Sequence, residues 1–279
     1  MFDFSDDELW FLIVALIGAC LGACRWYLTL FRVSSLNRDS KSQVLLHLAP
    51  LICLVLLTIV LQTLADPVYV VGHLDYTLLF LAGGACWIFG ASETFALMGV
   101  STLDDAMRRR NPAAAIAVAG GVLGVMFAYS GSNIGNGPTI WTTLVPAFVS
   151  TGVLLALWFA LELMGSGWEA ITLDHDVAAG IRLAAFLVCT GAILGRAMAG
   201  DWIDWDSTFS EFVKLAWPAA VLVPLMTLLN RRYAPTPQRP SPESGKCGWT
   251  PALLMFGITA VYLAYLGPPE VAPAVSFLS

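Results

Sequence analysis

Four ionisable side chains interrupt the apolar stretches of this sequence, and they are the first candidates for chemistry. Glu93, Glu162, Arg182 and His47 each lie near one end of an apolar stretch, within ~10 Å of the same boundary at ~1.5 Å per residue. Such groups are rare in lipid and usually pair or face water. They could therefore form a polar vestibule that handles an ion or a proton. Alternatively, Arg182 forms a structural salt bridge with Glu162 or Glu93, and the other side chains extend to the interface.

A second candidate site is acidic and lies outside the apolar stretches. Asp201, Asp204 and Asp206 alternate with Trp202 and Trp205. Clustered acids raise the local concentration of cations, which would make this segment a cation-attracting rim. Tryptophans spaced three apart beside acids are also typical of a short helix at a membrane interface. The sequence leaves both interpretations open.

Small residues form a third pattern. Gly120 and Gly124 are spaced as G-x-x-x-G, as are Gly191 and Gly195, and Gly121 extends the first small face. Without side-chain bulk, two helix backbones can approach closely and gain dispersion contacts. The spacing predicts helix packing at these positions, either within one subunit or between copies of the chain.

Motifs of enzymes, metal sites and nucleotide sites are missing from the sequence. It contains no Ser-His-Asp set, H-E-x-x-H, Walker loop or C-x-x-C, so we expect no enzyme activity, no cofactor and no metal. Most of the six cysteines lie in apolar stretches, where they act as small hydrophobic residues. The glycine-rich segment 130–138 follows no strand and predicts a tight turn. A net charge of −6 argues against nucleic acid as a partner.

The composition requires a lipid environment. Hydrophobic residues make up 58% of the chain and charged residues 12%, with a mean hydropathy of +0.75. An ordinary soluble domain carries about 25% charged residues, so a soluble fold of this composition would have too thin a polar shell. A lipid bilayer removes that constraint and is the first expected partner.

The apolar stretches predict an all-α polytopic bundle of about eight transmembrane helices. A spanning helix needs ~20 mostly apolar residues, and eight stretches come close: 9–31, 44–65, 76–99, 113–131, 139–164, 177–199, 212–230 and 249–266. We expect one integral membrane domain over 1–279, with N-terminal helices in 9–100, a core in 101–200 and C-terminal helices in 201–279. Segment 232–248 contains four prolines and predicts a mobile cytoplasmic loop.

The charges of the connections predict the orientation. Alternate connections are basic and contain Arg32, Arg38, Lys41, Arg108, Arg109, Arg110, Arg231, Arg232, Arg239 and Lys246. The other connections, around 66–75, 132–138 and 200–211, contain acids and no Lys or Arg. By the positive-inside rule the basic connections face the cytoplasm and both termini lie outside. The connection at 166–176 also lacks Lys and Arg, which makes it the least certain part of this topology.

Two segments of the sequence are alike. Arg110–Ala115 leads into Gly120–Gly124, and about 65 residues later Asp174–Gly180 leads into Gly191–Gly195. Each consists of a polar turn followed by a helix rich in small residues. The pattern predicts a parallel repeat of a helical hairpin over 111–199.

These two segments resemble the YjfL-like family of bacterial inner-membrane proteins, whose function is not established. The resemblance covers about residues 101–200 and rests on the Asn-x-Ala-Ala start at Asn111–Ala114, the glycine helix after it, and the Ala-Ala-Gly start at Val177–Gly180. The chain departs from the family pattern at Asp176, where Asn is expected, and by its additional helices on both sides. The resemblance implies a bacterial inner-membrane location and a helical bundle, and it implies no activity.

Two functions remain open from the sequence. The buried ionisable groups and the acidic rim favour a conduit or carrier for a small cation or proton, assembled as a homo-oligomer through the glycine faces. The alternative is a non-transporting scaffold or accessory subunit bound to a membrane-protein partner. The middles of the third to sixth helices are almost wholly apolar. This counts against a permanently open pore and leaves a gated conduit or a scaffold.

Overall fold

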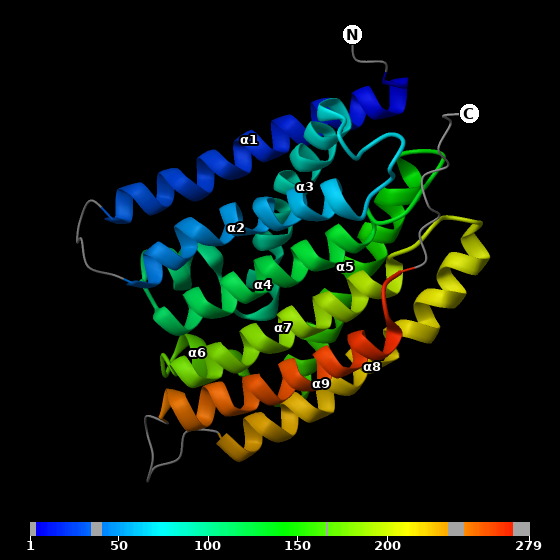
Figure 1. Cartoon of the computed structure of the whole chain (residues 1–279). Helices are drawn as coiled ribbons and strands as arrows, with labels where there is room; N and C mark the ends of the chain where they lie inside the picture. Colours follow the sequence, from blue (N-terminus) through cyan, green and yellow to red (C-terminus); the bar gives the residue numbers. More distant parts are fainter. Residues whose placement is uncertain (1–3, 35–40, 166, 234–242, 270–279) are drawn as a thin grey trace.

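The chain folds into α-helices throughout. A computed structural model describes residues 4–34, 41–165, 167–233 and 243–269 (Figure 1). Within these ranges no strand forms apart from an isolated bridge between Ala65 and Gly135. The α-helices are α1 (Asp6–Ser34), α2 (Lys41–Thr63), α3 (Leu74–Thr94), α4 (Pro112–Gly131), α5 (Trp141–Gly165), α6 (Gly167–Thr172), α7 (Val177–Met198), α8 (Trp205–Tyr233) and α9 (Thr250–Leu266). Shorter helices are η1 (Phe95–Met98), η2 (Thr102–Arg108) and η3 (Ser244–Trp249).

Over the described ranges, 8 helices are long and apolar enough to cross a membrane. They overlap the eight stretches predicted from the sequence, so the prediction of an all-α polytopic bundle is confirmed. The protein is a multi-pass integral membrane protein. The largest difference is at α8, which begins at Trp205 instead of residue 212. It begins there because Asp204 caps it: the Asp204 Oδ1 accepts a hydrogen bond from the backbone N–H of Ser207 at 2.8 Å.

Helices α4 and α7 form the centre of the bundle (Figure 1). In the membrane-spanning segment of α4, 83% of the residues are buried, and in that of α7 78% are buried. In the other spanning segments the share of buried residues is 44% or less. Helices α2 and α3 pack on α4, and α8 and α9 pack on α7. Helix α5 contacts both central helices and α8, whereas α1 lies mainly on α3. Contact with lipid therefore falls to the outer helices.

Glycines allow the backbones of α4 and α7 to touch. The contacts are Gly120 with Ala184, Gly124 with Leu187 and Gly191, and Gly195 with Phe127, while Gly121 lies against the ring of Phe95. Because the contacts advance in the same direction along both helices, α4 and α7 are parallel. These glycines pack helices within one chain, since neighbouring backbone and side chains already occupy the space beside them. Self-association of two copies of the chain, the other interpretation of the G-x-x-x-G spacing, would need another surface.

The turns that precede α4 and α7 share one geometry. Arg110 and His175 both have a φ of 54°, and the residues after them, Asn111 and Asp176, are the N-caps of the two helices. The backbone N–H of Asn111 donates to the Asp105 carbonyl oxygen (3.1 Å), and the Asn111 side chain accepts from the Ala113 N–H (2.9 Å). In the same pattern, the backbone N–H of Asp176 donates to the Ala170 carbonyl oxygen (2.8 Å), and the Asp176 side chain accepts from the Ala178 N–H (2.9 Å). Equivalent turns ahead of two parallel helices are what a parallel repeat predicts. Asp176 caps its helix in the same way as Asn111, so this departure from the family pattern leaves the local structure unchanged.

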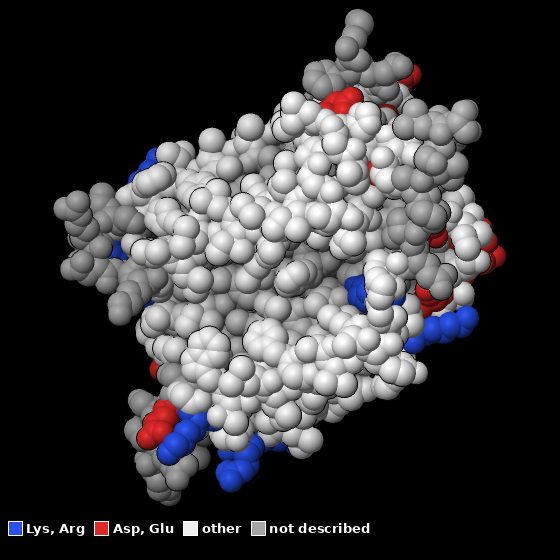
Figure 2. Space-filling view, in the orientation of Figure 1, with Lys and Arg blue, Asp and Glu red and all other residues white. Residues whose placement is uncertain are grey.

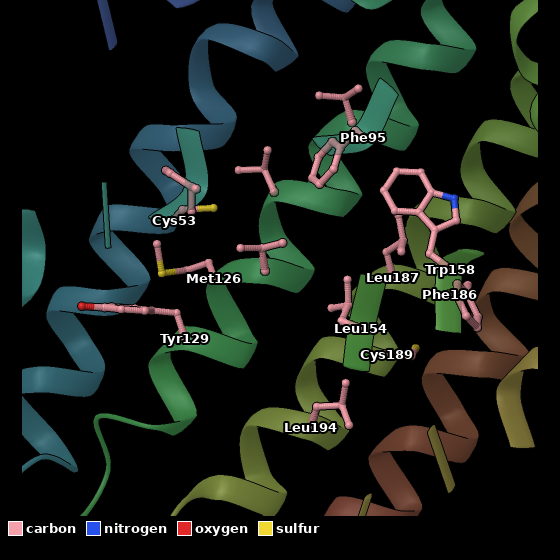
Figure 3. Close-up of a cluster of buried hydrophobic side chains, with 14 of the residues drawn as sticks. Cys53, Phe95, Met126, Tyr129, Leu154, Trp158, Phe186, Leu187, Cys189 and Leu194 are labelled. Atoms are coloured by element: carbon pink, nitrogen blue, oxygen red, sulfur yellow. The ribbon is translucent and has the colours of Figure 1, made fainter. Parts of the chain in front are cut away.

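The middle of the bundle is filled by apolar side chains. Figure 3 shows part of this core, in which Phe95, Trp158, Leu154 and Leu187 lie between the helices. All four are fully buried. The rings of Phe95 and Trp158 lie 5.0 Å apart and join η1 to α5. At these positions the interior is therefore closely packed and apolar.

The two ends of the bundle differ in charge. The acidic end contains the start of α1 and the connections 64–73, 132–140 and 199–204, whereas the basic end contains η2, α6 and η3. Figure 2 shows a broad uncharged surface between the ends, with Asp and Glu near the start of α1 and along the edge where α8 begins, where some Lys and Arg also lie. Much of the predicted mobile loop 232–248, residues 234–242, lies outside the described residues. Residues 244–248 belong to the short helix η3.

Candidate functional site

The four ionisable residues predicted as one cluster lie apart at the basic end. Glu93 on α3 pairs with Arg25 on α1 at 3.0 Å, and both side chains are about half exposed. His47 on α2 has its Nδ1 2.8 Å from the Gln43 carbonyl oxygen, and its ring packs against that of Phe31. These two residues thus belong to separate helix contacts at the surface of the bundle.

Arg182 is buried in α7, and its counter-charge differs from the one expected. The guanidinium lies 3.8 Å from Asp176, and both side chains are at most 3% exposed. It also donates to the Asn230 Oδ1 at 3.0 Å and to the Cys247 carbonyl oxygen at 2.6 Å. The predicted bridge to Glu162 or Glu93 is therefore wrong, because the side chain extends from α7 toward α8 and η3. Buried charges are stable only when paired and hydrogen-bonded. The guanidinium meets that requirement, whereas the Asp176 Oδ2 has the ion pair at 3.8 Å but no hydrogen bond within the described part of the chain.

Glu162 lies near this network without joining it. Its carboxylate accepts hydrogen bonds from the Trp158 Nε1 (3.2 Å) and from the Trp168 backbone N–H (3.0 Å). Together with Asn230 it lines a cavity of ≈ 10 Å³, about the volume of one water molecule. The basic end thus contains one polar network that joins α7, α8 and η3, and separate hydrogen bonds of Glu162 that join α5 to α6. The predicted polar vestibule of four residues is not formed there.

The aspartates of the predicted acidic rim have local structural partners. The Asp201 Oδ1 accepts the backbone N–H of Asn136 at 2.8 Å, and Asp204 caps α8. Hydrogen bonds from the backbone and hydroxyl of Ser207 lower the pKa of Asp204 below its ordinary value. Asp206 is exposed in the first turn of α8. Residues 201–204 are not helical, so the short interfacial helix that was also considered is wrong.

An acidic vestibule of ≈ 820 Å³ opens at this same end of the bundle. Its walls are the start of α1, the α2–α3 connection, the start of α3 and the α4–α5 connection. Four carboxylates line it: Asp6, Asp7, Glu8 and Asp66. Of the described residues, no Lys, Arg or His lines it. A concave surface with charges of one sign attracts counter-ions more strongly than a flat one, so the vestibule favours cations.

Local hydrogen bonds hold the α1 carboxylates in place. The Ser5 N–H donates to the Glu8 Oε2 (2.8 Å) and the Glu8 N–H donates to the Ser5 Oγ (3.4 Å), which is the reciprocal pattern of a capping box. The Tyr76 hydroxyl also donates to the Glu8 Oε2 at 3.3 Å. The Trp141 Nε1 donates to the Asp7 Oδ2 at 3.0 Å and links α1 to the start of α5. Acids in the first turn are further favoured by the helix dipole.

Asp66 is fixed by a tight turn on the opposite wall. Its Oδ1 accepts the backbone N–H groups of Val68 (2.7 Å) and Tyr69 (3.1 Å). This is the local bonding that makes Asp common in turns. The carboxylates therefore come from two separate elements of the chain, α1 and the α2–α3 connection.

Asn133 supplies a buried polar group on the vestibule wall. The residue is 6% exposed, lines the vestibule, and its Nδ2 donates to the Tyr129 carbonyl oxygen at 2.7 Å. That bond fixes the orientation of the amide, because a carbonyl accepts only from a donor. The Asn133 Oδ1 consequently remains a buried acceptor without a hydrogen-bond partner. Such an atom is costly to bury unless a donor reaches it.

Sequence reasoning found the acidic character of this end but missed the vestibule. The pattern Ser5-x-x-Glu8 before an apolar stretch is a recognisable helix start and could have placed these acids at a helix end. Their meeting with Asp66 depends on the packing of α1 on α3, which no local pattern encodes.

A metal site is not assembled from these acids. Within the described ranges, no group of three or more His, Cys, Asp or Glu side chains is placed to hold a metal ion. The carboxylates surround a wide space instead of converging on one point.

Comparison with known proteins finds one similarity, in the central part of the chain. No curated protein matches the chain, and no solved structure matches it. Residues 68–198 match the family described as "Domain of Unknown Function (DUF350)". The match extends from the connection before α3 to the end of α7, and so contains both turns of the repeat and the α4–α7 pair. This segment of the chain is therefore similar to a domain family of unknown function.

Proposed function

We propose that this chain binds a small cation at the acidic end of the bundle, as a membrane-embedded binding subunit. The observation that carries the proposal is the vestibule of ≈ 820 Å³, which is lined by Asp6, Asp7, Glu8 and Asp66. Acids from two separate elements face one space, and no described Lys, Arg or His there neutralises them. The main argument for a cation as ligand is that negative charges lining a concave surface attract cations more strongly than the same charges on a flat surface.

The charge asymmetry supports an outward-facing vestibule. The basic end carries Arg108–Arg110, Arg231, Arg232 and Lys246, and the positive-inside rule assigns such connections to the cytoplasm. The start of α1 and the end of α9 then lie outside. With the YjfL-like resemblance, this supports placing the chain in a bacterial inner membrane with its vestibule open to the external side.

The packed core argues for binding without free passage. Between the vestibule and the basic end lie the close-packed α4–α7 pair and a layer of aromatic side chains. The Tyr129 hydroxyl donates to the Phe80 carbonyl oxygen at 3.1 Å, and the ring of Trp87 lies 5.4 Å from that of Tyr129. A desolvated ion in this region would have no described carboxylate beside it, and charges in hydrocarbon are expensive.

A gated carrier is the second candidate function, and the position of Trp87 favours it. Its Nε1 donates to the Thr151 Oγ1 at 2.9 Å, so one hydrogen bond joins α3 to α5 below the vestibule. Breaking that bond and moving the ring aside would extend the vestibule inward between the two helices. The vestibule would then be the outer end of a transport path.

Parallel binding and flux measurements separate the two candidates. Purified protein in lipid nanodiscs is titrated with cations at low ionic strength, and the same protein in liposomes is assayed for cation uptake. Binding without uptake above empty liposomes supports the binding subunit. Uptake that increases on substituting Trp87→Phe, with binding retained, supports the carrier, because phenylalanine cannot form the hydrogen bond to Thr151. No cation binding in nanodiscs contradicts both.

A further inference from the structure

We infer that the chain also binds an anionic phospholipid, on the surface where α7, α8 and α9 reach the acidic end of the bundle. The phosphate would lie between Arg196 of α7 and Lys214 of α8, and the acyl chains would cover the exposed apolar side chains below them. The inference is independent of the proposed function, because neither cation lines the acidic vestibule. Its support comes from the position of the two cations, from their unused charge, from their depth in the membrane and from the surface around them.

The two cations flank one contact between helices. Within the described part of the chain, Arg196 and Lys214 are the only Lys or Arg residues at the acidic end. The Tyr262 hydroxyl on α9 donates to the carbonyl oxygen of Leu215 at 2.7 Å, which places α9 beside Lys214 on α8. Arg196 acts electrostatically on the same hydroxyl. Positive charge from two helices is therefore concentrated at the end of a third.

Both cations keep charge available for an anion. The Arg196 Nε and Nη2 donate to the carbonyl oxygens of Gly267 (3.1 Å) and Pro268 (3.2 Å), which are neutral acceptors. Lys214 has no ion pair and no side-chain hydrogen bond within the described part of the chain, although Glu211 lies one turn before it. Glu211 lines the small cavity between the α4–α5 and α7–α8 connections instead. Phosphate oxygens can accept from a guanidinium and an ammonium group together.

The two cations lie at the level of lipid phosphates. Helix α8 has 29 residues, whereas ~20 residues cross the hydrocarbon. Counted from Arg231 at the basic end, that length reaches about as far as Glu211. Lys214 therefore lies just inside the boundary and can extend its ammonium group outward. Arg196 lies in the last turn of α7, whereas Asp204 precedes α8 and lies farther from the hydrocarbon.

Exposed side chains around the two cations fit acyl chains. Val213, Trp217 and Val221 follow one another at intervals of four on α8 and are all at least half exposed, so they form one outward stripe. Val261 and Tyr265 of α9 are exposed as well. Trp and Tyr beside apolar residues are typical of the level where headgroups meet the hydrocarbon. Figure 2 shows basic side chains at the edge where α8 begins, next to an uncharged surface.

The two cations favour a lipid with a net negative charge. A zwitterionic headgroup brings its own ammonium group close to them, whereas an anionic headgroup such as phosphatidylglycerol brings none. Each basic residue near an anionic headgroup strengthens binding by about fivefold. We therefore expect this surface to prefer anionic over zwitterionic lipid by at least about fivefold.

Quenching of Trp217 by brominated lipids tests the inference. The full chain is reconstituted in phosphatidylcholine vesicles that contain a fixed share of brominated phosphatidylglycerol or of brominated phosphatidylcholine. The fluorescence that disappears on substituting Trp217→Phe reports quenching at this residue alone. Trp217 lies three residues after Lys214 on α8, so the two side chains are neighbours on one side of the helix. Brominated phosphatidylglycerol should associate with Trp217 at least about fivefold more tightly than brominated phosphatidylcholine.

Variants separate the phosphate contact from the structural bonds of Arg196. Lys214→Gln should lower the lipid preference by about fivefold, and Arg196→Gln/Lys214→Gln should abolish it. Arg196→Lys keeps the charge but loses the guanidinium that bonds to the end of α9, and should retain most of the preference. The matched control Lys246→Gln removes an exposed lysine at the basic end and should leave the preference at Trp217 within about twofold, because that charge is remote from the site.

Three results would overturn the inference. The first is equal association of the two brominated lipids with Trp217, which would mean ordinary contact with the bilayer. The second is a preference that the double variant retains. The third is a preference that Lys246→Gln loses equally, since it would then reflect net charge alone. Should the double variant fail to fold, Lys214→Gln decides by itself. None of these results depends on cation binding in the vestibule.

Discussion

The carbonyl oxygen of Gly124 on α4 lies against Gly191 on α7, and a Cβ atom at Gly191 would overlap it. The converse also holds, since a Cβ atom at Gly124 would overlap the backbone of α7 at Leu187. Neither conflict can be relieved by a side-chain rotation, because backbone atoms are involved. The two central helices are therefore held at a separation that only glycine permits, and the outer helices are arranged around this pair.

Adding one methyl group at this contact should destabilise the fold. We expect Gly191→Ala to lower the free energy of unfolding by about 1–3 kcal/mol, as for other overpacked cores. Gly152→Ala is the matched control, because a Cβ atom there meets nothing within 4 Å. It should leave stability unchanged or raise it by at most about 1 kcal/mol. Thermal unfolding of both variants in the same detergent measures the difference, and equal unfolding temperatures would contradict the close contact.

Replacing the buried Arg182 should lower the free energy of unfolding far more than replacing the half-exposed Arg25. Arg182→Leu leaves Asp176 buried without a counter-charge, which typically costs about 3–5 kcal/mol. Arg25→Leu breaks the half-exposed pair with Glu93 and should cost at most about 1 kcal/mol. Unfolding of the two variants, followed by tryptophan fluorescence, compares them directly. A similar loss of stability in both would mean that Arg182 is not held by its network.

Asn111 should stabilise both halves of the repeat. Its side chain caps α4, and its Nδ2 donates to the Ile171 carbonyl oxygen at 2.6 Å. Asn111→Ala removes both contacts. It should lower the free energy of unfolding by about 0.5–2 kcal/mol or more, which is the effect of losing an N-cap. Asn111→Ser keeps a capping oxygen and loses the donor to Ile171, so its stability should lie between those of the other two proteins. Any other order in a denaturation series would refute the double role.

The start of α8 should loosen in acid because of Asp204. Hydrogen bonds from Ser207 lower the pKa of this carboxylate in the folded protein below its ordinary value of 3.8. A lowered pKa contributes stability that is fully present above the ordinary value and is lost as the pH falls through the folded-state value. Trp205 begins the helix, so its fluorescence should change in that acidic range. The change should be absent in Asp204→Asn, and its persistence there would assign it to another group.

The helices were predictable because each is encoded locally. Apolar length alone located the eight spans, and the Asn111 cap with Pro112 is a local signal for the start of α4. The start of α8 was missed by seven residues, because the polar segment between Trp205 and Glu211 lowers the hydropathy of its first turns. In that segment the Asp204 cap, rather than apolar content, determines where the helix begins.

The candidate site was much less predictable, because it depends on contacts between distant segments. The sequence placed Glu93 and Arg182 at similar depth, but depth does not specify which helices are neighbours. Arg25 reaches Glu93 because α1 packs on α3, and Asp176 reaches Arg182 because both lie at the start of α7. The vestibule likewise requires α1 and the α2–α3 connection to meet, which only the tertiary structure determines.

The central claim is that carboxylates of the vestibule bind a cation, and equilibrium dialysis tests it most directly. The unmodified chain, Asp6→Asn/Asp66→Asn and the control Asp206→Asn are each dialysed in nanodiscs against radiolabelled rubidium or calcium ions at low ionic strength. The account predicts saturable binding that the double variant weakens by about 25-fold and that the control retains. Equal binding by all three proteins, or binding by none, would contradict it.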